Sequence, residues 1–162
     1  MKPLLPALAL PDQLQRGCDA LGLALEQSQA ELLLAYLELL LKWNSAYNLT
    51  AVRDPAQMVT RHLLDSLAIA PHLRGRDIID VGTGAGFPGL VLGAVCPDLQ
   101  VTLVEPRAKR VSFLRHIIRT LKLTNIRIVP ERLEMGMDLG FFDGVTSRAF
   151  AELALFLPLV EP

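Results

Sequence analysis

Cysteine is scarce in this 162-residue chain, and the scarcity excludes two classes of protein. Only Cys18 and Cys96 are present, and their separation matches neither a metal-ligand spacing nor a Cys-x-x-Cys redox motif. A disulfide-stapled scaffold is therefore excluded, and two free thiols indicate a reducing compartment. We expect both cysteines to be packing residues, and we expect no metal site.

Long uninterrupted hydrophobic runs are also missing, although half of the residues are hydrophobic. No run reaches the length that a membrane span requires, and Glu31 and Glu38 interrupt the most apolar segment. We therefore expect a cytoplasmic protein with no membrane partner. A chain of 162 residues can bury a proper hydrophobic core.

Acidic residues are nearly absent from residues 107–132, although the whole chain has a net charge of −1. The segment carries eight bases against one acid, Glu131, so its charge is 8 − 1 = +7 and the rest of the chain is −8. The bases are Arg107, Lys109, Arg110, Arg115, Arg119, Lys122, Arg127 and Arg132. A solvated helix face would explain such a run, but its one-sidedness favours a polyanionic partner. Arg107, Lys109, Arg110 and Arg115 are the candidate residues for binding the phosphates of such a partner, an RNA or a DNA.

A glycine-rich stretch organises the chain at residues 77–89. A short apolar run ending in Asp80 predicts a buried strand. Gly82, Gly84 and Gly86 follow and allow the backbone to turn tightly and approach a ligand closely. Pro88 suits the first position of a helix. The stretch predicts a strand, a ligand-binding loop and a helix.

The spacing of the glycines separates two cofactor classes. A dinucleotide fingerprint would place its third small residue at Phe87, which is too large for close helix–strand packing. The pattern acid-x-G-x-G-x-G, which begins at Asp80, instead resembles the first motif of class I S-adenosylmethionine-dependent methyltransferases. Glu105 ends the next expected strand, 105 − 82 = 23 residues after Gly82, where a carboxylate can accept hydrogen bonds from both ribose hydroxyls.

Strands and helices are expected to alternate after the glycine loop. The predicted strands are 77–81, 101–105, 126–129 and 142–147, and the predicted helices are 88–95, 107–121 and 151–158. This alternation predicts an α/β fold with a Rossmann-like, doubly wound parallel sheet. The ligand should lie where the strands end, at the loop 82–87, at Glu105, at Arg132–Glu134 and at Ser147–Ala149. Leu133 and Glu134 are placed to flank an adenine.

The N-terminal part is predicted to be helical. Expected helices cover residues 12–25, residues 28 to about 46 with a capping box formed by Ser28 and Glu31, and residues 56–70. Residues 43–50 mix aromatic and small polar side chains, as a ligand-facing loop does. We divide the chain into a helical cap, 1–72, and an S-adenosylmethionine-binding domain, 73–162.

Five motifs together resemble the ribosomal RNA small subunit methyltransferase G family, also called glucose-inhibited division protein B. They are Trp43-Asn44 through Asn48-Leu49-Thr50, Arg61-His62-x-x-Asp65-Ser66, the glycine loop, Lys109-Arg110-Val111-x-Phe113-Leu114, and Ser147-Arg148-Ala149. The resemblance implies methyl transfer from S-adenosylmethionine to N7 of one guanine in bacterial small-subunit (16S) ribosomal RNA. It also places cofactor contacts at Gly82, Phe87, Leu133, Glu134 and Arg148.

The chain departs from the family pattern in three places. Glu105-Pro106-Arg107 replaces the more usual Asp-Ser pair, Met135 replaces a common second acid, and family members continue beyond residue 162. We therefore expect a fragment with an incomplete C-terminal domain, whose fourth strand is an open edge.

Guanine N7 carries no proton, so its methylation needs alignment rather than a general base. Consistent with this, the fourth strand is not followed by an Asn-Pro-Pro-aromatic or Pro-Cys motif. We expect Asn48, His62 and Asp65 to frame the guanine pocket, with ribosomal RNA or a ribosomal particle as the substrate of a monomeric enzyme. The alternatives are a small-molecule methyltransferase of the same fold, a non-catalytic RNA-binding module and, disfavoured by Phe87, a nicotinamide oxidoreductase.

Overall fold

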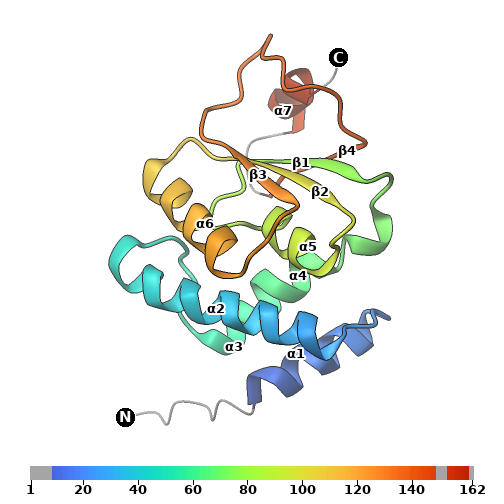
Figure 1. Ribbon diagram of the computed structural model, residues 1–162, viewed down its shortest axis with the longest axis vertical. Coiled ribbons are helices and arrows are strands. Elements are labelled where there is room, and N and C mark those ends of the chain that lie inside the picture. Colours follow the sequence, from blue (N-terminus) through green and yellow to red (C-terminus); the bar gives the residue numbers. More distant parts are fainter. Residues whose placement is uncertain (1–8, 149–152, 161–162) are drawn as a thin grey trace.

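The computed structural model describes residues 9–148 and 153–160, and its centre is a four-stranded parallel sheet of order β3-β2-β1-β4 (Figure 1). The strands are β1 (Asp77–Val81), β2 (Gln100–Val104), β3 (Ile126–Val129) and β4 (Gly144–Thr146). The predicted α/β fold with a parallel sheet is confirmed. The strand β4 is shorter than the predicted 142–147. Beyond its ends, the Asp143 carboxylate accepts from the amides of Arg76 and Asp77, and the Ser147 hydroxyl donates to the Val81 carbonyl.

Helices cover both faces of the sheet (Figure 1). On one face lie α5 (Gly89–Val95) and α6 (Ala108–Thr120), and α2 (Gln27–Tyr47) packs against both of them from outside. On the other face lie residues 130–143 and α7 (Leu153–Val160). The predicted helix 151–158 therefore extends to Val160, and its first two positions lie outside the described residues.

The direction in which the chain crosses the sheet reverses beside β1. The chain passes from β1 to β2 and β3 and then returns to β4 on the other side of β1. Such a switch point leaves a crevice at the carboxyl ends of the strands, where ligands bind in open α/β sheets.

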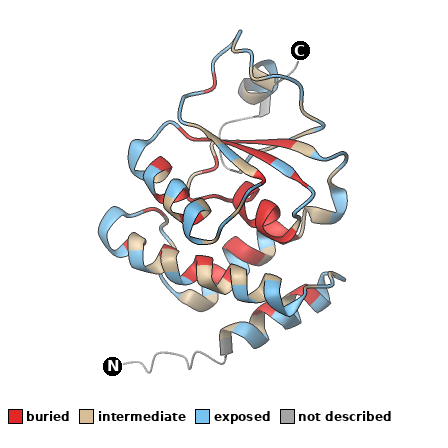
Figure 2. Cartoon of the chain, in the orientation of Figure 1, coloured by how far each residue is buried: buried red, intermediate tan, exposed pale blue. Residues whose placement is uncertain are grey.

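The main hydrophobic core joins the sheet to the N-terminal helices (Figure 2). It includes Leu33 and Leu40 of α2, Leu90 of α5, Leu103 of β2 and Phe113 of α6, each no more than 1% exposed. A smaller cluster on the opposite face contains Ile79, Val81, Val104 and Leu133, against which Phe142 and Leu159 pack. Buried residues thus line both faces of the sheet.

The first two helices differ from the prediction at their ends. The helix α1 (Ala9–Ala20) begins before residue 12, with Pro11 in its first turn, where a missing N–H breaks no helical bond. It ends before residue 25 because Gly22 is left-handed, with φ +69°. The predicted capping box of Ser28 and Glu31 is wrong: Gln29 Oε1 accepts from the Glu26 amide at 2.8 Å, two residues earlier than expected.

The predicted helix 56–70 is divided into four short elements. They are α3 (Pro55–Met58), the π-helical η1 (Val59–Leu64), α4 (Asp65–Leu67) and the 3₁₀ turn η2 (Ala70–His72). A π turn is uncommon and often marks a functional site. Nowhere in the described part of the chain is a helix long and apolar enough to cross a membrane.

Candidate active site

The glycine loop after β1 is held in place by hydrogen bonds to β2 and to α2. The amides of Gly82 and Thr83 donate to the Val104 carbonyl of β2, at 2.9 and 3.1 Å. From α2, the fully buried Tyr36 hydroxyl donates to the Ala85 carbonyl. Gly82, Gly84 and Gly86 have φ values of +69°, +63° and +107°, which a residue with a side chain rarely adopts.

Asp80, the acid of the glycine motif, is completely buried beneath this loop and supports it. Its Oδ2 accepts from the Thr83 hydroxyl at 2.6 Å and from the Gly89 amide at 2.7 Å, so it ties the loop to the start of α5. Burial raises the pKa of Asp80 from 3.8 to about 6. Gly89, and not Pro88, is the first residue of α5.

Glu105 closes the loop from the end of β2. It is only 2% exposed, and its two oxygens accept from the amides of Gly84 and Arg107, both at 2.9 Å. Arg110 lies 3.7 Å from the same carboxylate. Each carboxylate oxygen has a second lone pair, so Glu105 can still accept from the hydroxyls of a ribose.

A cavity of about 470 Å³ opens beside Glu105. Its lining includes Gly82, Arg110, Arg132, the buried Leu133 and Leu159 of α7. A carboxylate, an apolar side chain and exposed loop backbone suit an adenosine. Glu134 is exposed and does not line the cavities described here; its amide faces Met137 Sδ at 3.3 Å.

A second cavity of about 250 Å³ continues across the loop, because Gly82 and Arg110 line both. Its other lining residues are Leu49, Thr50, His62, Thr83, Gly84, Ala85, Phe87 and Arg148. A methyl group at Gly84 would have only Arg110 Nη1 near it, at 3.9 Å, so the loop backbone is open to a ligand there. The two cavities together offer room for a nucleoside on one side of the loop and a second group on the other.

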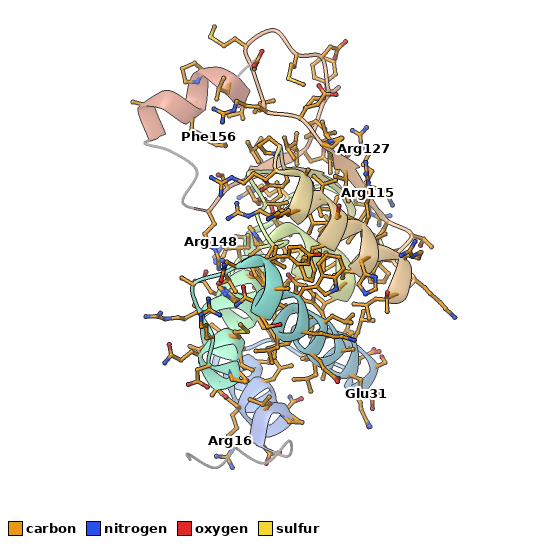
Figure 3. All side chains as sticks on the ribbon, turned by 90° about the vertical axis from the view of Figure 1, so that its left-hand side faces the viewer. Arg16, Glu31, Arg115, Arg127, Arg148 and Phe156 are labelled. Carbon is orange, nitrogen blue, oxygen red and sulfur yellow. The ribbon has the colours of Figure 1, made fainter. Side chains whose placement is uncertain are left out.

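The second cavity is walled by a stack of three side chains. The His62 ring, from the π turn η1, lies parallel to Phe87 with the centroids 4.3 Å apart, and the Arg148 guanidinium lies 5.1 Å from the same Phe87 centroid. Arg148 donates to the Arg61 carbonyl at 2.9 Å, to His62 Nδ1 at 3.2 Å and to Asp65 at 3.3 Å. Figure 3 shows Arg148 between the sheet and the N-terminal helices.

The environment of His62 keeps its imidazole neutral. Burial, reinforced by the neighbouring Arg148 cation, lowers the pKa of His62 from 6.5 to about 4. Thr50 Oγ1 lies 2.8 Å from its other ring nitrogen, Nε2. His62 and Asp65 are thus brought together through Arg148, although Asp65 stays exposed at its outer side.

Asn48 does not join this pair. It ends α2 with φ +50°, accepts from Arg53 at 2.7 Å and lines a third cavity, of about 400 Å³, with Tyr47 and Arg107 to Arg110. The expected ligand-facing loop 43–50 is only partly one, because Trp43 and the buried Asn44 belong to α2. Asn44 is structural: its Oδ1 accepts from the Thr50 amide at 2.9 Å.

The four predicted RNA-binding residues fall on or beside α6. Arg107, Lys109 and Arg110 lie at its first turn and line the third cavity, where Lys109 Nζ is 5.8 Å from the Tyr47 ring centroid. Arg115 is exposed further along the helix (Figure 3). Ala149, the last residue of the Ser147–Ala149 motif, lies outside the described residues.

Sequence reasoning misses two residues of the site. Tyr36 supports the loop from 49 positions away, and nothing in its sequence context indicates that contact. Thr50 enters the sequence argument only as part of a motif, although its position directly after the Asn48-Leu49 pair places it near the expected pocket.

Comparisons with known proteins identify the family. The family model described as rRNA small subunit methyltransferase G (GidB) matches residues 29–162. The chain belongs to the rRNA small subunit methyltransferase G family. The curated family member of Methylobacillus flagellatus is 49% identical over 152 residues, which cover 94% of this chain and 74% of that protein. The member of Salmonella arizonae is 50% identical over 143 residues, 88% of this chain and 69% of that protein.

Solved structures agree on the fold of this methyltransferase G family member. A precorrin-6y C5,15-methyltransferase from Geobacter metallireducens has a TM-score of 0.50 at 19% identity, over 71% of this chain and 58% of that one. A coclaurine N-methyltransferase bound to N-methylheliamine and S-adenosylhomocysteine has a TM-score of 0.51 at 16% identity, over 91% of this chain and 45% of that one. The family and the class I methyltransferase fold predicted from the sequence are confirmed.

Proposed function

We propose that this chain transfers a methyl group from S-adenosylmethionine to N7 of one guanine in bacterial small-subunit (16S) ribosomal RNA. The match of the methyltransferase G family model to residues 29–162 carries the proposal. The geometry supports it, because two cavities meet across the glycine loop at Gly82 and Arg110. One cavity suits an adenosine and the other is walled by His62, Phe87 and Arg148.

The residues present fit S-adenosylmethionine. In this proposal Glu105 accepts from the ribose hydroxyls, Leu133 contacts the adenine, and Gly82 and Gly84 leave their backbone accessible. Gly86 shapes the loop from inside, and Phe87 and Arg148 close the far cavity. Glu134 would have to reach the adenine amino group from its exposed position at the rim.

S-adenosylmethionine supplies an electrophilic sulfonium methyl group when it is bound. The chain's own residues then have to align the guanine, since N7 has a free lone pair and no proton to remove. Stacked side chains suit such alignment, because His62 and Phe87 form a flat, rigid wall, and alignment alone can accelerate a transfer greatly. We place the target guanine in the cavity lined by His62 and Arg148, with Asp65 holding Arg148 and Asn48 on the neighbouring RNA-facing side.

The first turn of α6 is proposed to bind RNA phosphates. Arg107, Lys109 and Arg110 lie together beside the third cavity, and Arg115 extends the charge along the helix. We expect Lys109→Ala to lower RNA affinity and to reduce the slope of log K against log salt by about 0.7 to 0.9, the share of one phosphate contact. Arg16→Ala, in α1 at the opposite end of the molecule (Figure 3), is the control and should leave the slope unchanged.

Methyl transfer is tested with tritiated S-adenosylmethionine and small-subunit RNA, offered as naked RNA and as the ribosomal particle. Borohydride–aniline cleavage at the labelled base identifies N7-methylguanine. Label at one guanine supports the proposal; label on a small-molecule acceptor alone supports the alternative methyltransferase. RNA binding without any transfer supports the non-catalytic module. Separate titrations of the protein with S-adenosylhomocysteine and with NAD as the control ligand test the cofactor class. Sedimentation at assay concentration tests whether the protein is a monomer. We propose that it acts in the cytoplasm.

A further inference from the structure

The hydroxyl group of Thr50 lies in the wall of the cavity that contains His62, Phe87 and Arg148. Thr50 is half-buried and directly follows Leu49 in the short segment after α2. Its amide is fixed by Asn44 at 2.9 Å, so its backbone position is set by α2. The hydrogen bonds around its side chain decide what it can offer a ligand.

The tautomer of His62 follows from its contact with Arg148. A guanidinium can only donate, so His62 Nδ1, 3.2 Å from Arg148 Nη2, must accept. The proton of the neutral imidazole is therefore on Nε2, which lies 2.8 Å from Thr50 Oγ1 and donates to it. The low pKa of His62, about 4, agrees with a ring that carries a single proton.

Thr50 Oγ1 accepts a second hydrogen bond, from the Val52 amide at 3.2 Å. A hydroxyl oxygen has two lone pairs, and both are now used. Its one proton is left to donate, and no residue within the described ranges 9–148 and 153–160 accepts it. Thr50 is thus an obligatory donor on the wall of the cavity.

We propose that the Thr50 hydroxyl determines specificity by donating a hydrogen bond to O6 of the target guanine. This inference rests on the proposed function. On the N7 edge of a purine, guanine presents the O6 acceptor, whereas adenine presents an amino donor at the same place. A fixed donor beside the methyl-accepting N7 therefore binds guanine and opposes adenine.

The rigidity of the chain Arg148–His62–Thr50 supports this role. Arg148 is held by the Arg61 carbonyl and Asp65, and the His62 ring is stacked on Phe87. The hydroxyl therefore cannot reverse its direction without moving the imidazole. Arg110 and Arg148 line the same cavity and also donate, so the experiment has to separate Thr50 from them.

The test pairs Thr50→Val, which keeps the shape and removes the donor, with an RNA that carries 2-aminopurine in place of the target guanine. The modified base keeps N7 but lacks O6. We expect Thr50→Val to lower kcat/KM on the guanine RNA by about 10- to 100-fold and to leave kcat/KM on the 2-aminopurine RNA within about twofold of wild type. Comparing variant with wild type on each RNA cancels the intrinsic difference in N7 reactivity. Thr50→Ser, which keeps the hydroxyl, should restore the preference for guanine.

An equal loss on both RNAs, or no loss on either, overturns the inference, because a structural role does not depend on O6. Circular dichroism and S-adenosylhomocysteine affinity show whether Thr50→Val is folded; if it is not, Thr50→Ala is put through the same two RNAs. A wild-type protein that methylates no guanine N7 refutes the proposed function itself. A wild type that methylates normally, with variants that do not distinguish the two bases, refutes only the role of Thr50.

Discussion

Arg148 connects more groups of the site than any other single side chain described here: Arg61, His62, Asp65 and Phe87. We predict that Arg148→Ala lowers methyl transfer by at least about 10-fold, since removing this partly buried guanidinium leaves the Arg61 carbonyl, His62 and Asp65 without their donor. The same change should raise the pKa of His62 only part of the way back to 6.5, because a neighbouring cation is lost while burial, the larger cause, remains. NMR titration of the three histidines measures the pKa.

Arg148→Lys is the matched variant for this prediction. It keeps the positive charge but not the planar fork, so the pKa of His62 should stay low while transfer still falls. If Arg148→Ala left transfer and S-adenosylhomocysteine affinity unchanged, the assignment of Arg148 to the site would be wrong.

Asp80 makes stability depend on pH in a way that one substitution can reveal. Its pKa is raised in the folded protein to about 6, above its ordinary 3.8, so folded Asp80 keeps its proton where unfolded Asp80 has lost it. The contribution of Asp80 to the free energy of unfolding is fully present below pH 3.8 and is lost as the pH rises through 6. We predict that Asp80→Asn becomes relatively more stable with rising pH, by up to about 3 kcal/mol between pH 4 and 7.

Urea unfolding of both proteins at each pH measures this difference. His62 affects stability over the same pH range with the opposite sign, because its lowered pKa makes stability fall as the pH drops from 6.5 toward 4. His62 is present in both proteins, so its effect cancels in the difference between them. Asp143→Asn is the control: hydrogen bonds from the Arg76 and Asp77 amides lower the pKa of Asp143, so this variant should lose relative stability toward neutral pH. A pH-independent difference for Asp80→Asn would contradict the prediction.

At the scale of elements, alanine substitutions in the glycine loop can distinguish a glycine that the fold requires from a glycine that a ligand would contact. Gly84, Gly86 and Gly136 all have positive φ, so alanine strains the backbone at each of them. At Gly86 the new methyl group would also lie 2.8 Å from Leu90 Cβ and 3.0 Å from the Tyr36 hydroxyl, whereas at Gly136 nothing lies within 4 Å. We predict a loss of about 3 kcal/mol or more for Gly86→Ala and about 1 kcal/mol for Gly136→Ala.

Gly84→Ala should resemble Gly136→Ala in stability, because only Arg110 Nη1 approaches its new methyl group, at 3.9 Å. It places that methyl in the cavity, however, so S-adenosylhomocysteine affinity should fall by about 10-fold or more while Gly136→Ala leaves it unchanged. Thermal unfolding and calorimetric titration measure the two effects. Equal affinities for the Gly84→Ala and Gly136→Ala proteins would remove Gly84 from the binding site.

Elements bounded by strong local signals were predictable from the sequence. The strands 77–81 and 126–129 have the bounds expected: Gly82 follows the first strand and Pro130 follows the second, and neither residue suits the interior of a strand. The π turn of η1 was not predictable from the sequence. Its apolar residues keep a helical spacing, although the π turn shifts the hydrogen-bonding register of the helix. Within the candidate site, Glu105 and Leu133 line one cavity, as residues expected at strand ends do, and their contact with a cofactor stays a prediction. The separation of Asn48 from His62 depends on the left-handed end of α2.

At the scale of the whole molecule, the proposed boundary at residue 72 divides a core that both segments share. Trp43, the single tryptophan, belongs to α2, yet its ring lies 5.5 Å from Phe113 and 5.2 Å from His116 of α6, centroid to centroid. Helix α2 also supplies Tyr36 to the glycine loop. Residues of the helical cap therefore support the glycine loop and share the core of the sheet.

We predict that the two segments unfold together. In urea, the fluorescence of Trp43 and the far-UV circular dichroism should report the same midpoint, as a two-state transition requires. S-adenosylhomocysteine at about 100 times its Kd should stabilise both signals equally, by about 2.7 kcal/mol, although Trp43 lines none of the three cavities. A Trp43 transition that comes first and ignores the ligand would instead establish residues 1–72 as an independent cap. If both signals have the same midpoint and shift equally with the ligand, the two segments share one core. Substitutions in α2 would then weaken cofactor binding through that core, although α2 lies far from the glycine loop in sequence.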